Sequence, residues 1–157
     1  MDKKAVDGYK KLAVLVFLFV AVAIFRSVAF DVVTVVGDSM NNTYFEDDLL
    51  IVKANTSEIE KNDVVVAKVE GQKIIKRVIA KPYDTVYING GKVYVNGVKV
   101  EGEFDFPTEE AGVASESYTL AEDEYFLMGD NRNHSKDSRD FGGVNIKDIK
   151  GIVMLKI

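Results

Sequence analysis

Three short polar stretches hold the residues whose types and spacing could do chemistry. Residues 37–40 (Gly-Asp-Ser-Met) end one apolar run, residues 76 and 77 (Lys-Arg) lie inside a second, and residues 129–142 form a polar loop after a third. A serine acts as a nucleophile when a base accepts its proton, and a lysine can be that base once its pKa is lowered. Since the chain has no cysteine and one histidine, His134, it offers neither a thiol nucleophile nor a multi-histidine metal site.

Ser39 and the Lys76-Arg77 pair each also have a plain structural interpretation. Glycine, aspartate and serine are common in turns, so Ser39 could simply follow a strand. Lys76 and Arg77 are adjacent in a predicted strand, and adjacent strand residues point to opposite faces. Unless that strand lies at a solvated edge, one charge faces inward. Burial there lowers the pKa of a lysine and makes its amine a better general base.

The loop of residues 129–142 mixes aspartates with basic residues. Asp130, Asp137 and Asp140 offer carboxylates, but their spacing does not match an EF-hand, so a calcium loop is not predicted. The interspersed aspartates and arginines predict instead a loop that its own ion pairs hold rigid. A rigid loop of this kind is suited to positioning other groups.

The elements that must position these residues are predicted to be β-strands of one domain. Runs rich in β-branched residues predict strands at residues 31–36, 49–53, 63–69 and 73–80, and further strands are predicted at residues 85–88, 92–95, 124–128 and 151–157. Asn-Gly pairs at residues 89–90 and 96–97 predict hairpin turns, whereas residues 101–117 are predicted to form a loop or a weak hairpin. The predicted fold class is all-β, a compact sheet or barrel-like catalytic domain over residues 31–157.

An apolar segment precedes this domain. It is unbroken over residues 12–25 and extends to residue 30 around Arg26, and a helix of this length rises roughly 28 Å, close to the thickness of a hydrocarbon core. Lysines gathered before it predict a cytoplasmic N-terminus (residues 1–11), a transmembrane anchor (12–30) and an extracytoplasmic domain (31–157). The alternative is a cleaved leader, because small residues at positions 27 and 29 suit a leader cleavage site.

Charge is distributed unevenly between the two parts. The whole chain carries a formal net charge of −5, although residues 1–30 contain five basic against two acidic residues. The β domain is therefore strongly acidic, and nucleic acid is not an expected partner.

In their order along the chain, these stretches resemble the type I signal peptidases, which are membrane-anchored Ser/Lys endopeptidases. The resemblance rests on the N-terminal apolar segment, Gly-x-Ser-Met at residues 37–40, Lys-Arg-Val-Ile at 76–79 and Gly-Asp-Asn-Arg-x-x-Ser-x-Asp-Ser-Arg-x-x-Gly at 129–142. It covers nearly the whole chain, and the last motif is long and specific. The chain is similar to the compact Gram-positive form, which lacks a large second β domain.

The resemblance implies a role for each matching residue. Ser39 matches the nucleophile, with a backbone N–H that would contribute to the oxyanion hole, and Lys76 matches the general base. Ser135 matches a hydroxyl that hydrogen-bonds the lysine. Two ion pairs are expected to brace the catalytic floor, Arg77 with Asp130 and Asp137 with Arg139. The residues expected to bind the substrate are Met40, Val36, Ile74 and Ile75.

The sequence departs from the family pattern in turns beside these residues. The usual Ser-Met-x-Pro-Thr is Ser-Met-Asn-Asn-Thr at residues 39–43, and the usual Gly-Leu-Pro-Gly-Asp is Ala-Lys-Pro-Tyr-Asp at 80–84. Gly37 stands where some relatives have a second serine whose hydroxyl faces the oxyanion, so that donor is absent. His134 occupies a position without a catalytic role in the family.

The predicted function is a serine endopeptidase that removes N-terminal signal peptides from exported preproteins through an acyl-enzyme, with no cofactor and no metal. Its expected partners are signal peptides and membrane lipid. An extended peptide would add as a strand between residues 32–36 and 73–76, and the resemblance implies small side chains at the −1 and −3 positions.

Two rival functions remain open. One is an assembly factor for surface structures such as pili, which would bind without cutting. The other is a self-cleaving Ser/Lys repressor-type protease with the same β core, for which a membrane helix has no purpose.

Overall fold

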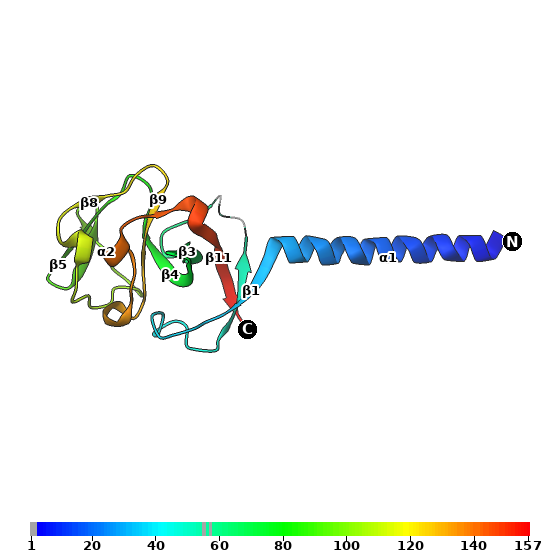
Figure 1. Cartoon of the computed structure of the whole chain (residues 1–157), viewed down its shortest axis with the longest axis horizontal. Coiled ribbons are helices and arrows are strands. Elements are labelled where there is room, and N and C mark those ends of the chain that lie inside the picture. The colour runs from blue at the N-terminus through cyan, green and yellow to red at the C-terminus, as the bar shows by residue number, and fades with distance from the viewer. Residues whose placement is uncertain (1–2, 55, 57) are drawn as a thin grey trace.

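The chain folds into a long N-terminal helix followed by a domain of antiparallel strands (Figure 1). The computed structural model describes residues 3–54, 56 and 58–157, and within the first helix it describes the side chains of residues 8–22. The helical elements are α1 (Lys3–Ala29), η1 (Gly112–Ser115), η2 (Arg132–His134), α2 (Ser138–Phe141) and η3 (Ile146–Asp148). The strands are β1 (Phe30–Thr34), β2 (Leu49–Lys53), β3 (Val64–Val69), β4 (Gln72–Ala80), β5 (Thr85–Asn89), β6 (Lys92–Val95), β7 (Val98–Lys99), β8 (Tyr118–Thr119), β9 (Glu124–Met128), β10 (Val144–Asn145) and β11 (Ile149–Lys156).

Two sheets make up the β domain, which confirms the predicted all-β class. The larger sheet has the strand order β1-β2-β11-β3-β4-β9-β10, and the smaller has the order β7-β6-β5-β8. Every pairing is antiparallel. Strand β1, which continues directly from α1, forms one edge of the larger sheet, so its outer backbone edge is open to another strand.

Strand β9 shows why the middle of the larger sheet is rigid. Its residues Phe126 and Met128 pack into the apolar core shared with the smaller sheet, whereas Tyr125 and Leu127 pack into a second cluster. Successive strand residues point to opposite faces, so β9 is covered on both sides and is apolar without alternation. The neighbouring strand β4 pairs with β3 on one side and β9 on the other.

The predicted strands agree closely with the structure. Each of the eight is present, with ends that differ from the prediction by at most two residues. The additional strands, β7, β8 and β10, have two residues each and are too short to show a periodic pattern. Within residues 101–117 the structure has one short helical turn, η1, in agreement with the predicted loop.

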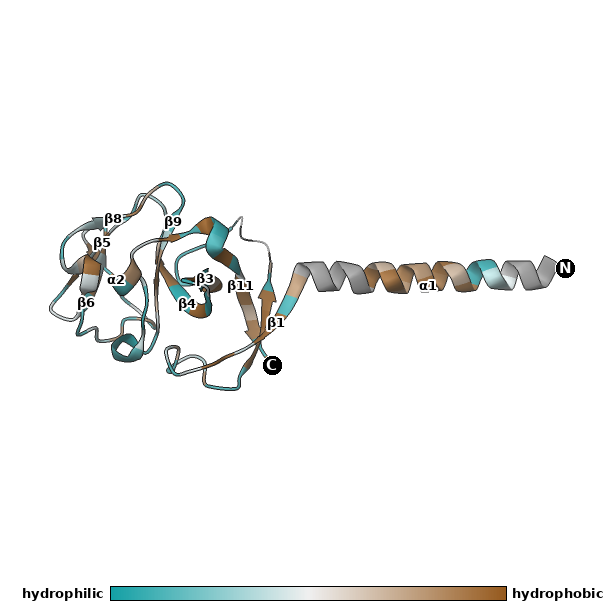
Figure 2. Cartoon of the chain, in the orientation of Figure 1, coloured by the Kyte–Doolittle hydropathy of each residue, from teal (hydrophilic) through white to brown (hydrophobic). Residues whose placement is uncertain are grey.

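Helix α1 extends away from the β domain (Figure 1). Its central part is apolar (Figure 2), and the large apolar side chains from Leu12 to Val22 are exposed. Among the residues that the structure describes, there is no helix with the length and apolarity needed to cross a membrane. The anchor over residues 12–30, and the division of the chain built on it, stay predictions.

Candidate active site

Ser39 and Lys76 lie together although 37 residues separate them in the sequence. A hydrogen bond of 2.5 Å joins Lys76 Nζ to Ser39 Oγ. Lys76 is only 4% exposed, and Arg77 beside it is buried as well. The interpretation that both charges are solvated at an edge strand is therefore wrong, because both side chains are buried and β4 lies between β3 and β9 in the sheet.

Burial changes the protonation of the lysine. Desolvation is the main cause that lowers the pKa of Lys76, and the nearby charge of Arg139 acts in the same direction. The carboxylates of Asp137, Asp130 and Asp38 oppose this effect without reversing it. The neutral amine, which can accept a proton, is therefore more populated at a given pH than in an exposed lysine.

Ser39 is held in a short segment between β1 and β2. Gly37 makes the preceding bend with φ +83°, a conformation that side chains other than glycine rarely adopt. The backbone N–H of Asn131 donates to the carbonyl oxygen of Ser39 at 3.1 Å. A Cβ atom on Gly129 would lie only 2.5 Å from that same carbonyl oxygen, so glycine is required for this close approach. The residues that follow β9 thus fix the position of the Ser39 backbone.

The predicted ion pair between Arg77 and Asp130 is present and buried. Arg77 donates through Nε at 2.8 Å and Nη2 at 2.6 Å to the two oxygens of the Asp130 carboxylate. The Thr43 hydroxyl donates to the same carboxylate at 2.5 Å. Since Thr43 follows Ser39 closely and Arg77 follows Lys76, this one carboxylate ties together the segments that carry both reactive side chains.

The second predicted ion pair, between Asp137 and Arg139, is also present. Arg139 Nε and Nη2 donate to the Asp137 carboxylate at 2.8 and 2.9 Å. Its oxygens also accept the backbone N–H of Gly129 at 2.9 Å and that of Arg139 at 3.2 Å. Asp137 caps α2 in the same way, so the loop of residues 129–142 is held by its own charges as predicted.

Ser135 differs from the expectation. Its hydroxyl donates to Asp137 Oδ2 at 2.8 Å, and no hydrogen bond joins it to Lys76 within the described residues. The Asp137 carboxylate, two residues away, takes the one hydrogen that the Ser135 hydroxyl can donate. Ser135 therefore hydrogen-bonds the buried pair of Asp137 and Arg139, not Lys76.

Sequence reasoning missed the contribution of the segment from Phe104 to Glu110. The ring of Phe104 covers the guanidinium of Arg77 at 3.4 Å from the ring centroid. Arg132, buried and without a carboxylate partner among the described residues, donates to the carbonyl oxygen of Phe104 at 3.0 Å and to that of Gly129 at 3.0 Å. Arg139 donates to the Glu110 carbonyl at 3.2 Å. The loop of residues 104–110 thus contacts three buried arginines, and its sequence has no periodic pattern that would have predicted these contacts.

A groove leads to Ser39 and Lys76. It has a volume of about 430 Å³ and lies between residues 33–40 on one side and residues 72–76 on the other. The four residues predicted to bind substrate, Met40, Val36, Ile74 and Ile75, all line it. Val36 is 83% exposed, Ile74 and Ile75 are partly buried, and Met40 forms a buried part of the wall.

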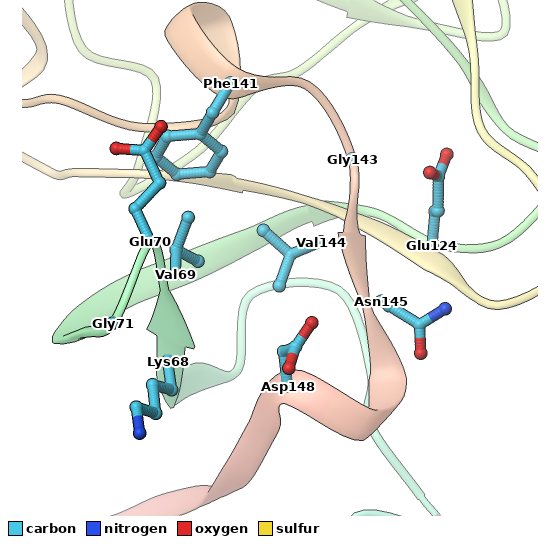
Figure 3. A pocket seen from close by; sticks show the side chains of 10 residues that line it. All are labelled: Lys68, Val69, Glu70, Gly71, Glu124, Phe141, Gly143, Val144, Asn145 and Asp148. Carbon is cyan, nitrogen blue, oxygen red and sulfur yellow. The ribbon is translucent and has the colours of Figure 1, made fainter.

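A larger cavity of about 600 Å³ lies elsewhere, between the β3–β4 turn and β10 (Figure 3). Its lining mixes apolar side chains with the carboxylates of Glu70, Glu124 and Asp148 and contains none of the predicted site residues. In the part of the chain that the structure describes, no group of three or more potential acidic, histidine or cysteine ligands could hold a metal ion. His134 is exposed at the end of η2.

An antiparallel β domain with a serine and a buried lysine in contact points to a hydrolase. Residues 9–157 match the family described as signal peptidase, peptidase S26. Because the match covers most of the chain, the protein belongs to this family of peptidases.

The chain is similar to several bacterial signal peptidases. It is 31% identical to signal peptidase I of Bacillus amyloliquefaciens, over 92% of this chain and 83% of the relative. It is 32% identical to signal peptidase I P of Bacillus subtilis subsp. natto, over 94% and 85%. The crystal structure of a signal peptidase I from Enterococcus faecalis is similar with a TM-score of 0.52 and 25% identity, covering 64% of this chain and all of that one.

Proposed function

We propose that this protein is a serine endopeptidase that removes N-terminal signal peptides from exported preproteins, with Ser39 as the nucleophile and Lys76 as the general base. The observation that carries the proposal is the 2.5 Å contact between Ser39 Oγ and a buried lysine at the end of an open groove. A chain with one histidine and no cysteine needs such a base.

The reaction begins with neutral Lys76. Its amine takes the hydroxyl proton of Ser39 while Oγ attacks the scissile carbonyl carbon and forms a tetrahedral intermediate. The intermediate collapses when protonated Lys76 gives that proton to the leaving amine, so the mature protein departs and an ester remains on Ser39. Neutral Lys76 then takes a proton from water as the water attacks the ester, and returns it to Ser39 Oγ as the signal peptide is released.

The developing oxyanion needs a donor. Within the described residues, the backbone N–H of Ser39 donates to no protein acceptor, so it is available to the oxyanion. Gly37 has no hydroxyl to add a second donor. Its φ of +83° would strain a serine placed there, although the space beside its Cα is open.

The groove suits an extended peptide. Residues 73–76 of β4 pair with β3, but β9 pairs with β4 only from Arg77 onward, so their second edge is open within the described residues. Strand β1 contributes the other open edge. A peptide backbone laid between them could hydrogen-bond on both sides, as in strand addition. Buried Met40 limits the depth available to a side chain and is consistent with small residues beside the cut.

We also propose that α1 holds the protein at a membrane, with the N-terminus in the cytoplasm and the β domain outside. Exposed apolar side chains on α1 support this, because insertion into a bilayer would transfer them from water to an apolar environment. Further apolar side chains are exposed on the strands near the end of α1, among them Phe30, Val32 and Met154. These side chains would place the groove close to the lipid surface, where signal peptides emerge.

The test is cleavage of a purified preprotein by the detergent-solubilised full chain. Ser39→Ala and Lys76→Ala should each abolish cleavage, and Lys76→Arg should also fail because a guanidinium stays protonated. Ser117→Ala and Lys92→Ala are matched controls, because both side chains are exposed outside the groove, and they should cut at the wild-type rate. Wild-type activity in Lys76→Ala would exclude the dyad. Binding of the preprotein without cutting by the wild type would favour the assembly-factor function.

A further inference from the structure

Asparagine side chains join the nucleophile segment to the polar loop in both directions. From the loop, Asn131 donates its backbone N–H to the carbonyl of Ser39 and its side-chain amide to the carbonyl of Asp38, each at 3.1 Å. From the nucleophile segment, Asn42 donates its side-chain amide to the carbonyl of Asp130, also at 3.1 Å. The two segments are 87 to 93 residues apart in sequence, so these bonds fix their tertiary placement.

The backbone of Asn42 is as unusual as its contact. Its φ is +101°, in the region that asparagine tolerates and most other side chains avoid. Proline cannot adopt this φ, because its ring holds φ near −65°. Among the described residues, no acceptor binds the backbone N–H of Asn42, so proline would disturb the angle without removing a backbone hydrogen bond.

The turn at Asn42 lies between two groups that matter for the dyad. Ser39 precedes it by three residues, and Thr43, which binds the Asp130 carboxylate, follows it. Asp130 in turn holds Arg77, the neighbour of Lys76. A shift of the turn would therefore move Ser39 Oγ relative to Lys76 Nζ, and proton transfer requires these atoms to stay within hydrogen-bond reach.

We propose that Asn42 and Asn131 are positioning residues that form a reciprocal clamp on Ser39. The clamp fixes the nucleophile against the loop that braces Lys76, and the left-handed backbone of Asn42 sets the shape of the turn. This inference deepens the proposed function and rests on it for its catalytic consequence. The clamp bonds to Asp38 and Ser39 on one side of the groove, whereas residues 72–76 on the other side lie outside it. Loss of the clamp should therefore lower kcat more than it changes KM.

Three variants separate the parts of the clamp. Asn42→Pro forbids the observed φ, Asn42→Gly keeps that φ and removes the amide, and Asn131→Ala removes one amide while keeping the backbone N–H. Asn96→Gly is the matched control: Asn96 also has a positive φ, +53°, and its side chain binds Thr85 and Asp84 in the smaller sheet. The control should lower the unfolding midpoint without altering Ser39.

Two measurements on each full-length variant test the proposal. We expect kcat for preprotein cleavage to fall roughly 10- to 100-fold in Asn42→Pro and about 3- to 10-fold in Asn42→Gly and Asn131→Ala, with a smaller change in KM. Amide hydrogen exchange at Asn131, whose N–H donates to Ser39, should accelerate about tenfold in both Asn42 variants. Asn96→Gly should change neither quantity.

The outcomes distinguish failure of the clamp from failure of the proposed function. Wild-type kcat and exchange in all three clamp variants, or equal losses in Asn96→Gly, would overturn the clamp while leaving the peptidase intact. A wild-type protein that does not cleave would overturn the proposed function, and the exchange at Asn131 would still report whether Asn42 holds the segment. If Asn42→Pro fails to fold, Asn42→Gly and Asn131→Ala decide the matter.

Discussion

Replacing Asp137 by alanine would remove a carboxylate that accepts five hydrogen bonds. It accepts two bonds from the Arg139 guanidinium, the backbone N–H groups of Gly129 and Arg139, and the Ser135 hydroxyl. Asp137 is completely buried, and Arg139 is only 5% exposed. The substitution would leave the Arg139 charge buried, with three backbone carbonyls as its remaining acceptors.

The expected cost follows from that burial. Removing one partner of a buried ion pair costs about 3–5 kcal/mol, because the other charge stays desolvated. Loss of the cap on α2 involves the same carboxylate, so its cost of about 1 kcal/mol should not be added in full. For a β domain of this size, the unfolding midpoint should fall by roughly 10–15 °C. Asp137→Asn should lose nearly as much, because it removes the charge and places an amide among donors.

The assay is thermal unfolding followed by circular dichroism, with Glu60→Ala as the matched control. Glu60 and Lys81 form an ion pair of similar length, 2.7 Å, but Glu60 is 68% exposed. Exposed pairs contribute little, so the control should barely move the midpoint. A midpoint in Asp137→Ala no lower than in Glu60→Ala would refute the reasoning that buried charges hold the polar loop.

Four further outcomes are expected. Ser135→Ala should lower the free energy of unfolding by about 0.5–1.5 kcal/mol and kcat by less than tenfold, because Asp137 keeps its other donors; thermal melts and initial rates check this, and a much larger loss of kcat would show that the hydroxyl turns to Lys76 during the reaction. The pH profile of kcat/KM should rise with a midpoint below the ordinary lysine value of 10.5, because burial lowers the pKa of Lys76. The unfolded chain binds the Lys76 proton more tightly than the folded one, so the free energy of unfolding should increase as the pH rises from the folded pKa of Lys76 to its unfolded pKa. Denaturation of Lys76→Ala across the same pH range should lack this increase. Intact mass spectrometry of the membrane fraction should find α1 retained, whereas a chain that begins at Phe30 would support a cleaved leader.

The strands were predictable because their signals are local. Short runs with β-branched residues locate β2 and β6 without error, and Asn-Gly marks the hairpin after β5. The two-residue strands could not be found, since nothing periodic fits in two positions. The burial of both Lys76 and Arg77 could not be predicted from periodicity, because the residues that contact them, Ser39, Phe104 and Asp130, come from separate parts of the chain.

The site was predictable mainly through the order of its motifs. No spacing rule brings Ser39 to Lys76 across 37 residues, and the expectation came from the family resemblance. The hydrogen-bond partner of Ser135 could not be predicted. When a hydroxyl lies near both an amine and a carboxylate, differences of a fraction of an ångström determine which of them it bonds. One indication of the clamp residue Asn42 was present in the sequence, namely the absence of the expected proline. Interpreting that absence requires the φ angle of Asn42, which only the structure provides.

The most direct measurement of the central claim is to trap the acyl-enzyme and locate it. The full-length protein is mixed with a peptide ester that carries small residues before the cut, quenched in acid within one turnover, and mapped by mass spectrometry. A dyad of Ser39 and Lys76 predicts an acyl group on the peptide that contains Ser39 in the wild type, and none in Ser39→Ala or Lys76→Ala. Acylation at another residue, or undiminished acylation of Ser39 in Lys76→Ala, would contradict it.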